Sequence, residues 1–157
     1  MFREGPIEGL VVKPLERLDD ARGWLIELYR EDELAPAMHP VMAYASQTLP
    51  GVVRGPHEHR RQTDCFAFVG PGDFKLYLWD TRADSPTSGN RHVLLAGESN
   101  RQRVIIPPGV VHAYRNVSQV PALMFNAPNR LYAGEGKKEP VDEIRYEDRP
   151  DSPFVMD

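Results

Sequence analysis

The chain has 157 residues, of which 27% are charged, and a formal net charge of -4. Acidic and basic residues are interspersed, which argues against a nucleic-acid partner or a membrane surface, and no apolar stretch approaches the roughly 20 residues that span a bilayer. The length fits one domain. The single cysteine, Cys65, excludes an intrachain disulfide, and the polar N-terminus leads us to expect a cytoplasmic protein.

Short runs rich in Val, Ile, Phe, Tyr and Leu alternate with turn signals from 15 prolines and 12 glycines. This punctuation is typical of an antiparallel sheet with many strands. In chain order, the predicted strands are 9–14, 24–30, 41–48, 65–69, 74–80, 91–95, 103–106 and 122–127. Only residues 30–37 favour a short helix. The predicted fold is therefore all-β, a double-sheet jelly roll, and we expect the polar, proline-broken tail from about residue 132 to wrap the barrel.

Two segments carry the strongest functional signal. Residues 51–64 contain His57 and His59, and residues 107–116 contain His112. Residues two apart in a strand point to the same face, so His57 and His59 can both face the barrel interior. A lone histidine says little, but three at this spacing indicate a site.

The two segments resemble the two sequence motifs of the cupin superfamily, which implies one cupin barrel over residues 1–157. In that superfamily two histidines, a carboxylate a few residues later and the histidine of the second motif hold a divalent metal. The corresponding residues are His57, His59, Asp64 and His112, with Asp64 standing where glutamate is usual and brought back towards the histidines by a turn. Three imidazoles and a carboxylate suit Fe, Mn, Ni, Cu or Zn. Without metal, the same residues would be catalytic or structural.

Most of the chain, from about residue 7 to residue 127, resembles the dTDP-4-dehydrorhamnose 3,5-epimerase family, an all-β branch of the cupins. The resemblance is carried in family order by segments 20–27, 53–57, 80–87 and 106–112. It implies a nucleotide-sugar substrate, no cofactor, and a homodimer that shares an N-terminal strand.

In that family, the histidine at the position of His57 is the general base that removes protons from carbons beside the C4 ketone. Imidazole suits this task because it titrates near neutral pH. The resemblance also implies that Arg22 and Arg54 hold phosphate and sugar, as planar forked donors do well. We expect Glu27, in the same motif as Arg22, and Tyr114 to belong to the substrate site.

Two charged positions depart from the family pattern. The family lysine that stabilises the enolate falls at Asp64, and a carboxylate would repel an enolate. The family aspartate of the next strand falls at Lys75. We therefore expect Lys75 either to pair with Asp64 or to replace the missing cation, which makes His57, His59, Lys75 and His112 the candidate catalytic set.

Two further residues that take part in the family's catalysis are missing from their expected positions. The family tyrosine that donates a proton falls at Phe125, which has no exchangeable proton. The aspartate that orients the family's catalytic histidine has no counterpart unless Asp148 or Asp151 folds back. The remaining candidate proton donors are Tyr44, Tyr77, Tyr114 and Tyr132.

The sequence is compatible with three different functions. The first is an epimerase or isomerase of a keto-sugar nucleotide, with His57 as base and Lys75, Arg54 or a metal stabilising the enolate; residues 54–59 also resemble a segment of the sugar-nucleotide 3,4-ketoisomerases. The second is a metal-dependent cupin of another class, such as an oxygenase, a lyase or a small-acid isomerase, which explains Asp64 better. The third is a cupin that binds a ligand without catalysis.

Overall fold

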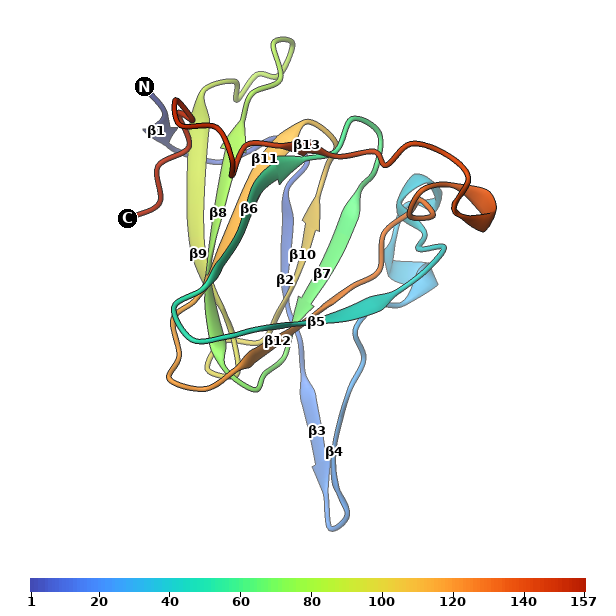
Figure 1. Ribbon diagram of the computed structural model, residues 1–157. Helices are drawn as coiled ribbons and strands as arrows, with labels where there is room; N and C mark the ends of the chain where they lie inside the picture. Colours follow the sequence, from blue (N-terminus) through green and yellow to red (C-terminus); the bar gives the residue numbers. More distant parts are fainter.

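Two β-sheets face each other in the computed structural model, which describes residues 1–157 (Figure 1). The six-stranded sheet follows the order β1 (Arg3–Glu4), β9 (Asn90–Gly97), β8 (Asp73–Asp80), β11 (Val110–Asn116), β6 (Val53–Glu58) and β13 (Ile144–Arg145). The five-stranded sheet follows the order β2 (Val11–Pro14), β10 (Gln102–Ile106), β7 (Asp64–Phe68), β12 (Ala122–Asn126) and β5 (Tyr44–Thr48). Neighbouring strands pair antiparallel except β1 and β9, which are parallel.

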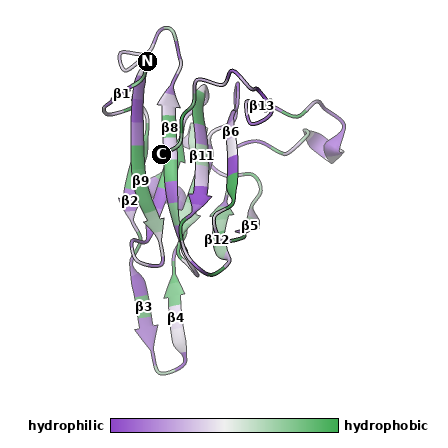
Figure 2. Ribbon diagram, turned by 60° about the vertical axis from the view of Figure 1, so that its left-hand side comes forward, coloured by the Kyte–Doolittle hydropathy of each residue, from purple (hydrophilic) through white to green (hydrophobic).

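A separate hairpin of β3 (Arg17–Asp20) and β4 (Gly23–Ile26) projects from one end of the barrel (Figure 1). Figure 2 shows that β3 is mainly hydrophilic and β4 more hydrophobic. Trp24 and Leu25 on β4 are 56% and 57% exposed, so the apolar side of the hairpin has no cover within this chain.

The helical segments are short 3-10 turns: η1 (Glu31–Glu33), η2 (Pro36–Met38) and η3 (Glu135–Lys137). The helix predicted over residues 30–37 is thus broken into two turns. The reason is Pro36, because a proline disfavours helical geometry at the residue before it, and Ala35 is extended. No helix in the structure has the length and apolarity to cross a membrane.

Alternation along the strands separates the side chains into two packed layers. Even-numbered residues of β8, such as Phe74, Leu76 and Leu78, point between the sheets and are fully buried. They pack with Phe66 and Phe68 of β7 in the main core. The ring of His112 packs on Phe66 of this core, with 5.5 Å between the ring centroids, so the histidine group borders the core.

The odd-numbered residues of β8 point to the outer face of the six-stranded sheet. There Tyr77 and Trp79 are buried under the C-terminal tail, whose Phe154 packs on Trp79 with 5.3 Å between ring centroids. The tail therefore does pack against the barrel, as Figure 1 also shows. A residue on this face lies behind the sheet, outside the space between the two sheets.

The predicted all-β jelly roll is confirmed, but five strands were missed. Three of them are β1, β3 and β13, and the other two, β6 and β11, carry His57 and His112. The polar residues of β6 and β11, together with Gly55 and Pro56, hide the apolar alternation that marks a strand.

Candidate active site

His57 and His112 lie directly opposite each other on the paired strands β6 and β11. Their ring centroids are 4.3 Å apart, and His59 completes the group at 5.5 Å from His57 and 5.9 Å from His112. The pairing of β6 with β11 shifts register between His112 and Tyr114, which marks a bulge at Gly55. The bulge allows Arg54 and His57, three residues apart, to face the same cavity.

Gly55 is required at this bulge for two reasons. Its φ of 82° lies in the left-handed region that favours glycine. A Cβ placed on it would lie 2.6 Å from the backbone oxygen of His112. The backbone of the two histidine strands can therefore approach this closely only where residue 55 has no side chain.

Asp64, at the start of β7, is fully buried against the histidines, as expected from the turn that precedes it. Its Oδ2 lies 3.3 Å from Nε2 of His59 and 3.4 Å from Nε2 of His112. Its Oδ1 accepts hydrogen bonds from the side-chain amides of Gln62, at 2.8 Å, and Asn126, at 2.7 Å. All of the acceptor capacity of this carboxylate is therefore directed inside the site.

Asp64 and His59 shift each other's titration. Burial alone would disfavour both charged forms, but the hydrogen bond and the charge of Asp64 outweigh burial and raise the pKa of His59 to about 9. The same contact, with a smaller contribution from His112, holds the pKa of Asp64 well below its ordinary value in spite of burial. The two residues form a buried ion pair at neutral pH.

His57, in contrast to His59, is uncharged at neutral pH. Burial, followed by the neighbouring imidazoles of His112 and His59, lowers the pKa of His57 to about 2. Burial also lowers the pKa of His112. His57 is thus a neutral imidazole at physiological pH.

The C-terminal strand β13 brings acidic residues to the histidines. It pairs with β6 so that Arg145 stands opposite His57, and Oε1 of the preceding Glu143 lies 4.0 Å from Nδ1 of His57. The carboxylate of Asp142 accepts hydrogen bonds from the backbone N–H groups of residues 60–62, and its carbonyl oxygen contacts Nδ1 of His59. The tail therefore fixes the backbone that follows His59 and places a carboxylate beside His57.

A cavity of about 450 Å³ opens onto this group from the space between the sheets. It is large enough for a sugar ring and part of a diphosphate. Arg54 is held at its wall by bonds to Thr48 Oγ1, at 3.0 Å, and to the carbonyl oxygen of Gln47, at 2.9 Å. The polar residues of the wall include Tyr44, Ser46, Arg54, His57, His59, Tyr114, Tyr132 and Arg145.

Residues 4–149 match the profile of the family described as dTDP-4-dehydrorhamnose 3,5-epimerase. The chain belongs to the dTDP-4-dehydrorhamnose 3,5-epimerase family. It is accordingly an enzyme of the carbohydrate epimerase class and not a binding module alone. The resemblance found in the sequence is confirmed.

Similar proteins agree with this membership. The chain is 37% identical over 135 residues to the probable low-salt glycan biosynthesis epimerase Agl13 of Haloferax volcanii, covering 85% of each chain. It is 38% identical over 115 residues to the spore coat polysaccharide biosynthesis protein SpsL of Bacillus subtilis, covering 73% of this chain and 75% of SpsL. The crystal structure of a dTDP sugar isomerase from Desulfovibrio desulfuricans G20 superposes with a TM-score of 0.78 at 27% identity, covering 95% of this chain and 91% of that chain.

Among the residues that the family resemblance implied, Arg54 and Tyr114 do line the cavity with the three histidines. Lys75 does not, and the expectation that it pairs with Asp64 or reaches the substrate is wrong. It shares the outer face of β8 with Tyr77, and its Nζ donates to the backbone oxygen of Asp157, at 3.1 Å. Strand alternation explains the error, because Leu76 is the neighbour that points inward.

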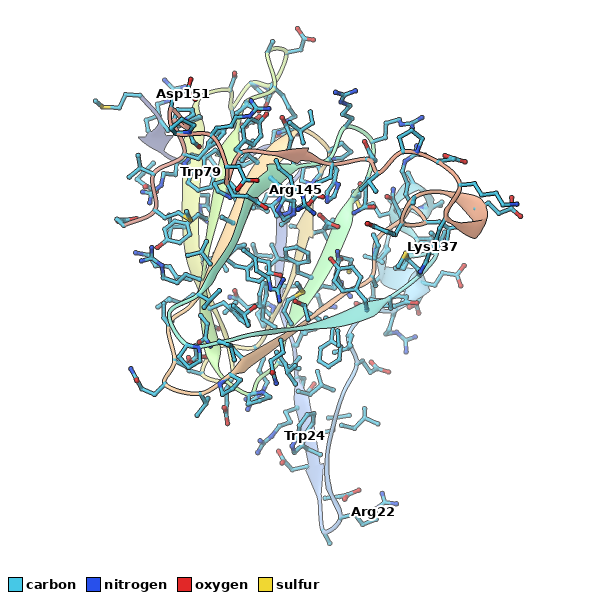
Figure 3. The ribbon with its side chains drawn as sticks, viewed as in Figure 1. Arg22, Trp24, Trp79, Lys137, Arg145 and Asp151 are labelled. Carbon is cyan, nitrogen blue, oxygen red and sulfur yellow. The ribbon has the colours of Figure 1, made fainter.

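Arg22 and Glu27 also lie outside the cavity of their own chain. Arg22 sits at the tip of the β3–β4 hairpin, 90% exposed and bound only to Asp20 (Figure 3). Glu27 pairs with Arg30 at 3.5 Å beyond the end of β4. Neither residue contacts the histidines within one chain.

Phe125, at the position of the family's proton donor, does not line the cavity. Phe125 points to the outer face of the five-stranded sheet, where it lines a small apolar pocket with Leu28 and Cys65. Its neighbours on β12, Met124 and Asn126, are the ones that face the interior. The residue beside Asp64 at this point of the site is therefore Asn126.

Sequence reasoning missed Glu143, Asp142 and Asn126. Asp148 and Asp151, the residues expected to fold back, are exposed further along the tail, and Figure 3 shows Asp151 well beyond Arg145. A two-residue strand such as β13 has no periodicity to detect. The one available signal is the pair of adjacent carboxylates, Asp142 and Glu143, directly before Ile144 in the otherwise polar tail.

Proposed function

We propose that this protein epimerises a dTDP-4-keto-6-deoxyhexose, with His57 as the general base that removes a proton from a carbon beside the ketone. The observation that carries the proposal is a buried imidazole at a cavity wall with a carboxylate, Glu143, 4.0 Å behind its Nδ1. A carboxylate in this position favours the tautomer whose Nε2 is free to accept a proton, and it stabilises the imidazolium that forms.

Arg54 is the cation proposed to offset the negative charge of the enolate. Of the candidates raised by the sequence, Lys75 is on the wrong face of its strand, whereas Arg54 lies on the cavity wall three residues before His57. Its guanidinium is already oriented by Thr48 and Gln47, so little conformational freedom is lost when substrate binds. The reaction itself needs no cofactor because only protons move.

Exchange of solvent deuterium tests the proposal directly. The protein is incubated in D2O with dTDP-4-keto-6-deoxyglucose, and deuterium at C3 and C5 is followed by NMR. We expect exchange with the wild type and a loss of about 100-fold or more in His57→Asn. His39→Asn, a change directly after η2 at a residue that does not line the cavity, serves as the control. Equal exchange by wild type and His57→Asn would refute the assignment of the base.

The same proposal includes a homodimer in which Arg22 reaches the cavity of the partner. Two features support it: the hairpin projects away from its own barrel with Trp24 and Leu25 exposed, and Arg22 at its tip has no partner except Asp20. Light scattering should give twice the chain mass, and Arg22→Ala should raise KM more than it lowers kcat. A monomer with unimpaired activity would contradict this part.

A second candidate is a metal-assisted reaction. One nitrogen from each of His57, His59 and His112 lies within 4.8 Å of the others, so the three imidazoles fit a single divalent ion, and Asp64 faces two of them. An ion held there would supply positive charge near an enolate or carbonyl oxygen. Metal analysis of untagged protein tests it: a near-stoichiometric metal that disappears in His59→Ala would favour this candidate.

A further inference from the structure

Tyr44 faces His57 across the cavity. His57 comes from β6 of the six-stranded sheet, and Tyr44 comes from β5 of the five-stranded sheet, which forms the opposite wall. A sugar ring bound between the two sheets therefore presents one face to the imidazole and the other to the phenol. Inversion at a carbon needs this arrangement, because the new proton must arrive on the face opposite the one that was lost.

The hydroxyl of Tyr44 is oriented by the buried amide of Asn126. Asn126 Oδ1 accepts a hydrogen bond from the backbone N–H of Cys65, at 3.0 Å, which fixes which end of the amide is Nδ2. Nδ2 then donates to Asp64 Oδ1, at 2.7 Å, and to the Tyr44 oxygen, at 3.1 Å. The oxygen of Tyr44 is thus an acceptor in this contact, which leaves its own hydrogen available to a bound substrate.

The phenol of Tyr44 is also protonated at neutral pH, as a proton donor must be. Burial of the hydroxyl raises the pKa of Tyr44 to about 12, more than the bond from Asn126 lowers it. A carbon beside a ketone is a still weaker acid than a phenol, so transfer from Tyr44 to an enolate carbon is favourable. The bond from Asn126 then stabilises the phenolate that remains.

The other tyrosines are less suitable. Tyr114 lies on β11, which pairs with β6 in the same sheet as His57, and so it lies on the same side of a bound sugar as the base. Tyr77 faces the outer side of the sheet and donates to Asp157. Tyr132 and Tyr44 both line the cavity and are 56% and 44% exposed, but only the Tyr44 hydroxyl is held by a hydrogen bond, from Asn126. Of these side chains, Tyr44 alone combines the opposite wall with a hydroxyl oriented by a buried group.

We propose that Tyr44 is the proton donor that completes inversion, replacing the tyrosine that β12 lacks. The proposal rests on the proposed epimerase function. His57 takes the proton as the C–H bond breaks, and the electron pair moves onto the ketone oxygen. The O–H bond of Tyr44 then breaks as a C–H bond forms on the opposite face. Afterwards His57 loses its proton to water and the phenolate takes one from water, so the enzyme returns to its starting state.

The test separates removal of the proton from inversion. Wild type, Tyr44→Phe, Tyr132→Phe and Tyr29→Phe are incubated with dTDP-4-keto-6-deoxyglucose in D2O, and NMR follows deuterium in the starting sugar and the appearance of the inverted product. For Tyr44→Phe we expect exchange within about threefold of wild type but inverted product reduced about 100-fold or more, because His57 still removes and returns a proton on one face. Tyr29→Phe, which removes a hydroxyl outside this cavity, should match wild type.

Each outcome decides the proposal. Tyr44→Phe protein that forms inverted product at the wild-type rate would overturn it. So would loss of inversion in Tyr132→Phe instead of Tyr44→Phe, or equal loss of exchange and inversion in Tyr44→Phe with an unchanged thermal midpoint, which would show a binding role. Absence of exchange in the wild type is a different result, because it refutes the proposed function itself and needs no variant.

Discussion

Oε1 of Glu143 lies 4.0 Å from Nδ1 of His57, so a residue of the C-terminal tail stands behind the candidate base. The contact depends on the short pairing of β13 with β6, which sets Arg145 opposite His57. The part of the chain with the least regular structure thus supplies the acidic group that holds the imidazole.

Replacing Glu143 by Gln should lower kcat about tenfold or more while KM changes little. The amide keeps the size of the side chain but removes the charge that stabilises the His57 imidazolium. Steady-state kinetics with the keto-sugar nucleotide check this. The matched control is Asp148→Asn, which neutralises an exposed acid further along the tail. An equal loss of kcat in both variants would contradict a specific role for Glu143.

The low pKa of His57 predicts an unusual pH profile. A histidine with the ordinary pKa of 6.5 would lose base activity tenfold per pH unit below that value, but His57, with its pKa lowered to about 2 by burial and by its neighbouring imidazoles, stays neutral. We expect kcat/KM of the wild type to show no loss from His57 protonation between pH 8 and pH 5. A titration near pH 6.5 that disappears in His57→Asn would contradict the prediction.

The raised pKa of His59 predicts that stability falls with increasing pH. A histidine whose pKa is raised from 6.5 to about 9 in the folded protein stabilises it fully below pH 6.5, and this contribution is lost as the pH rises through 9. The free energy of unfolding should therefore decrease across this window by up to about 1.4 kcal/mol per pH unit. Urea unfolding at several pH values measures it. The decrease should be absent in His59→Gln, and parallel curves for the two proteins would contradict the ion pair with Asp64.

Removing the charge of Lys75 should leave catalysis intact. Lys75→Ala loses a contact with Asp157 on the outer face of the six-stranded sheet, so kcat/KM should stay within about twofold of wild type. Arg54→Ala is the informative comparison, because it removes a cation from the cavity wall and should lower kcat/KM by about 100-fold. A comparable loss in Lys75→Ala would show that Lys75 reaches the site.

The residues that sequence reasoning placed well share one property: each lies in a local pattern. His57, His59 and Asp64 belong to one segment of eight residues, and their proximity follows from a strand and the turn after it. His112 comes from a second such segment, which pairs with the first. Local spacing therefore sufficed to predict the histidine group and the position of its carboxylate.

The sequence by itself determined the all-β jelly roll and the group of His57, His59, His112 and Asp64, because strand alternation and turn residues act over a few neighbouring positions. Only the tertiary structure decided which face of β8 holds Lys75 and which residue of β12 meets Asp64. A shift of one residue in a strand moves a side chain to the other face, and the sequence pattern alone does not fix that register. The contact of Glu143 with His57 spans 86 positions and arises from packing of the tail, which no local pattern encodes.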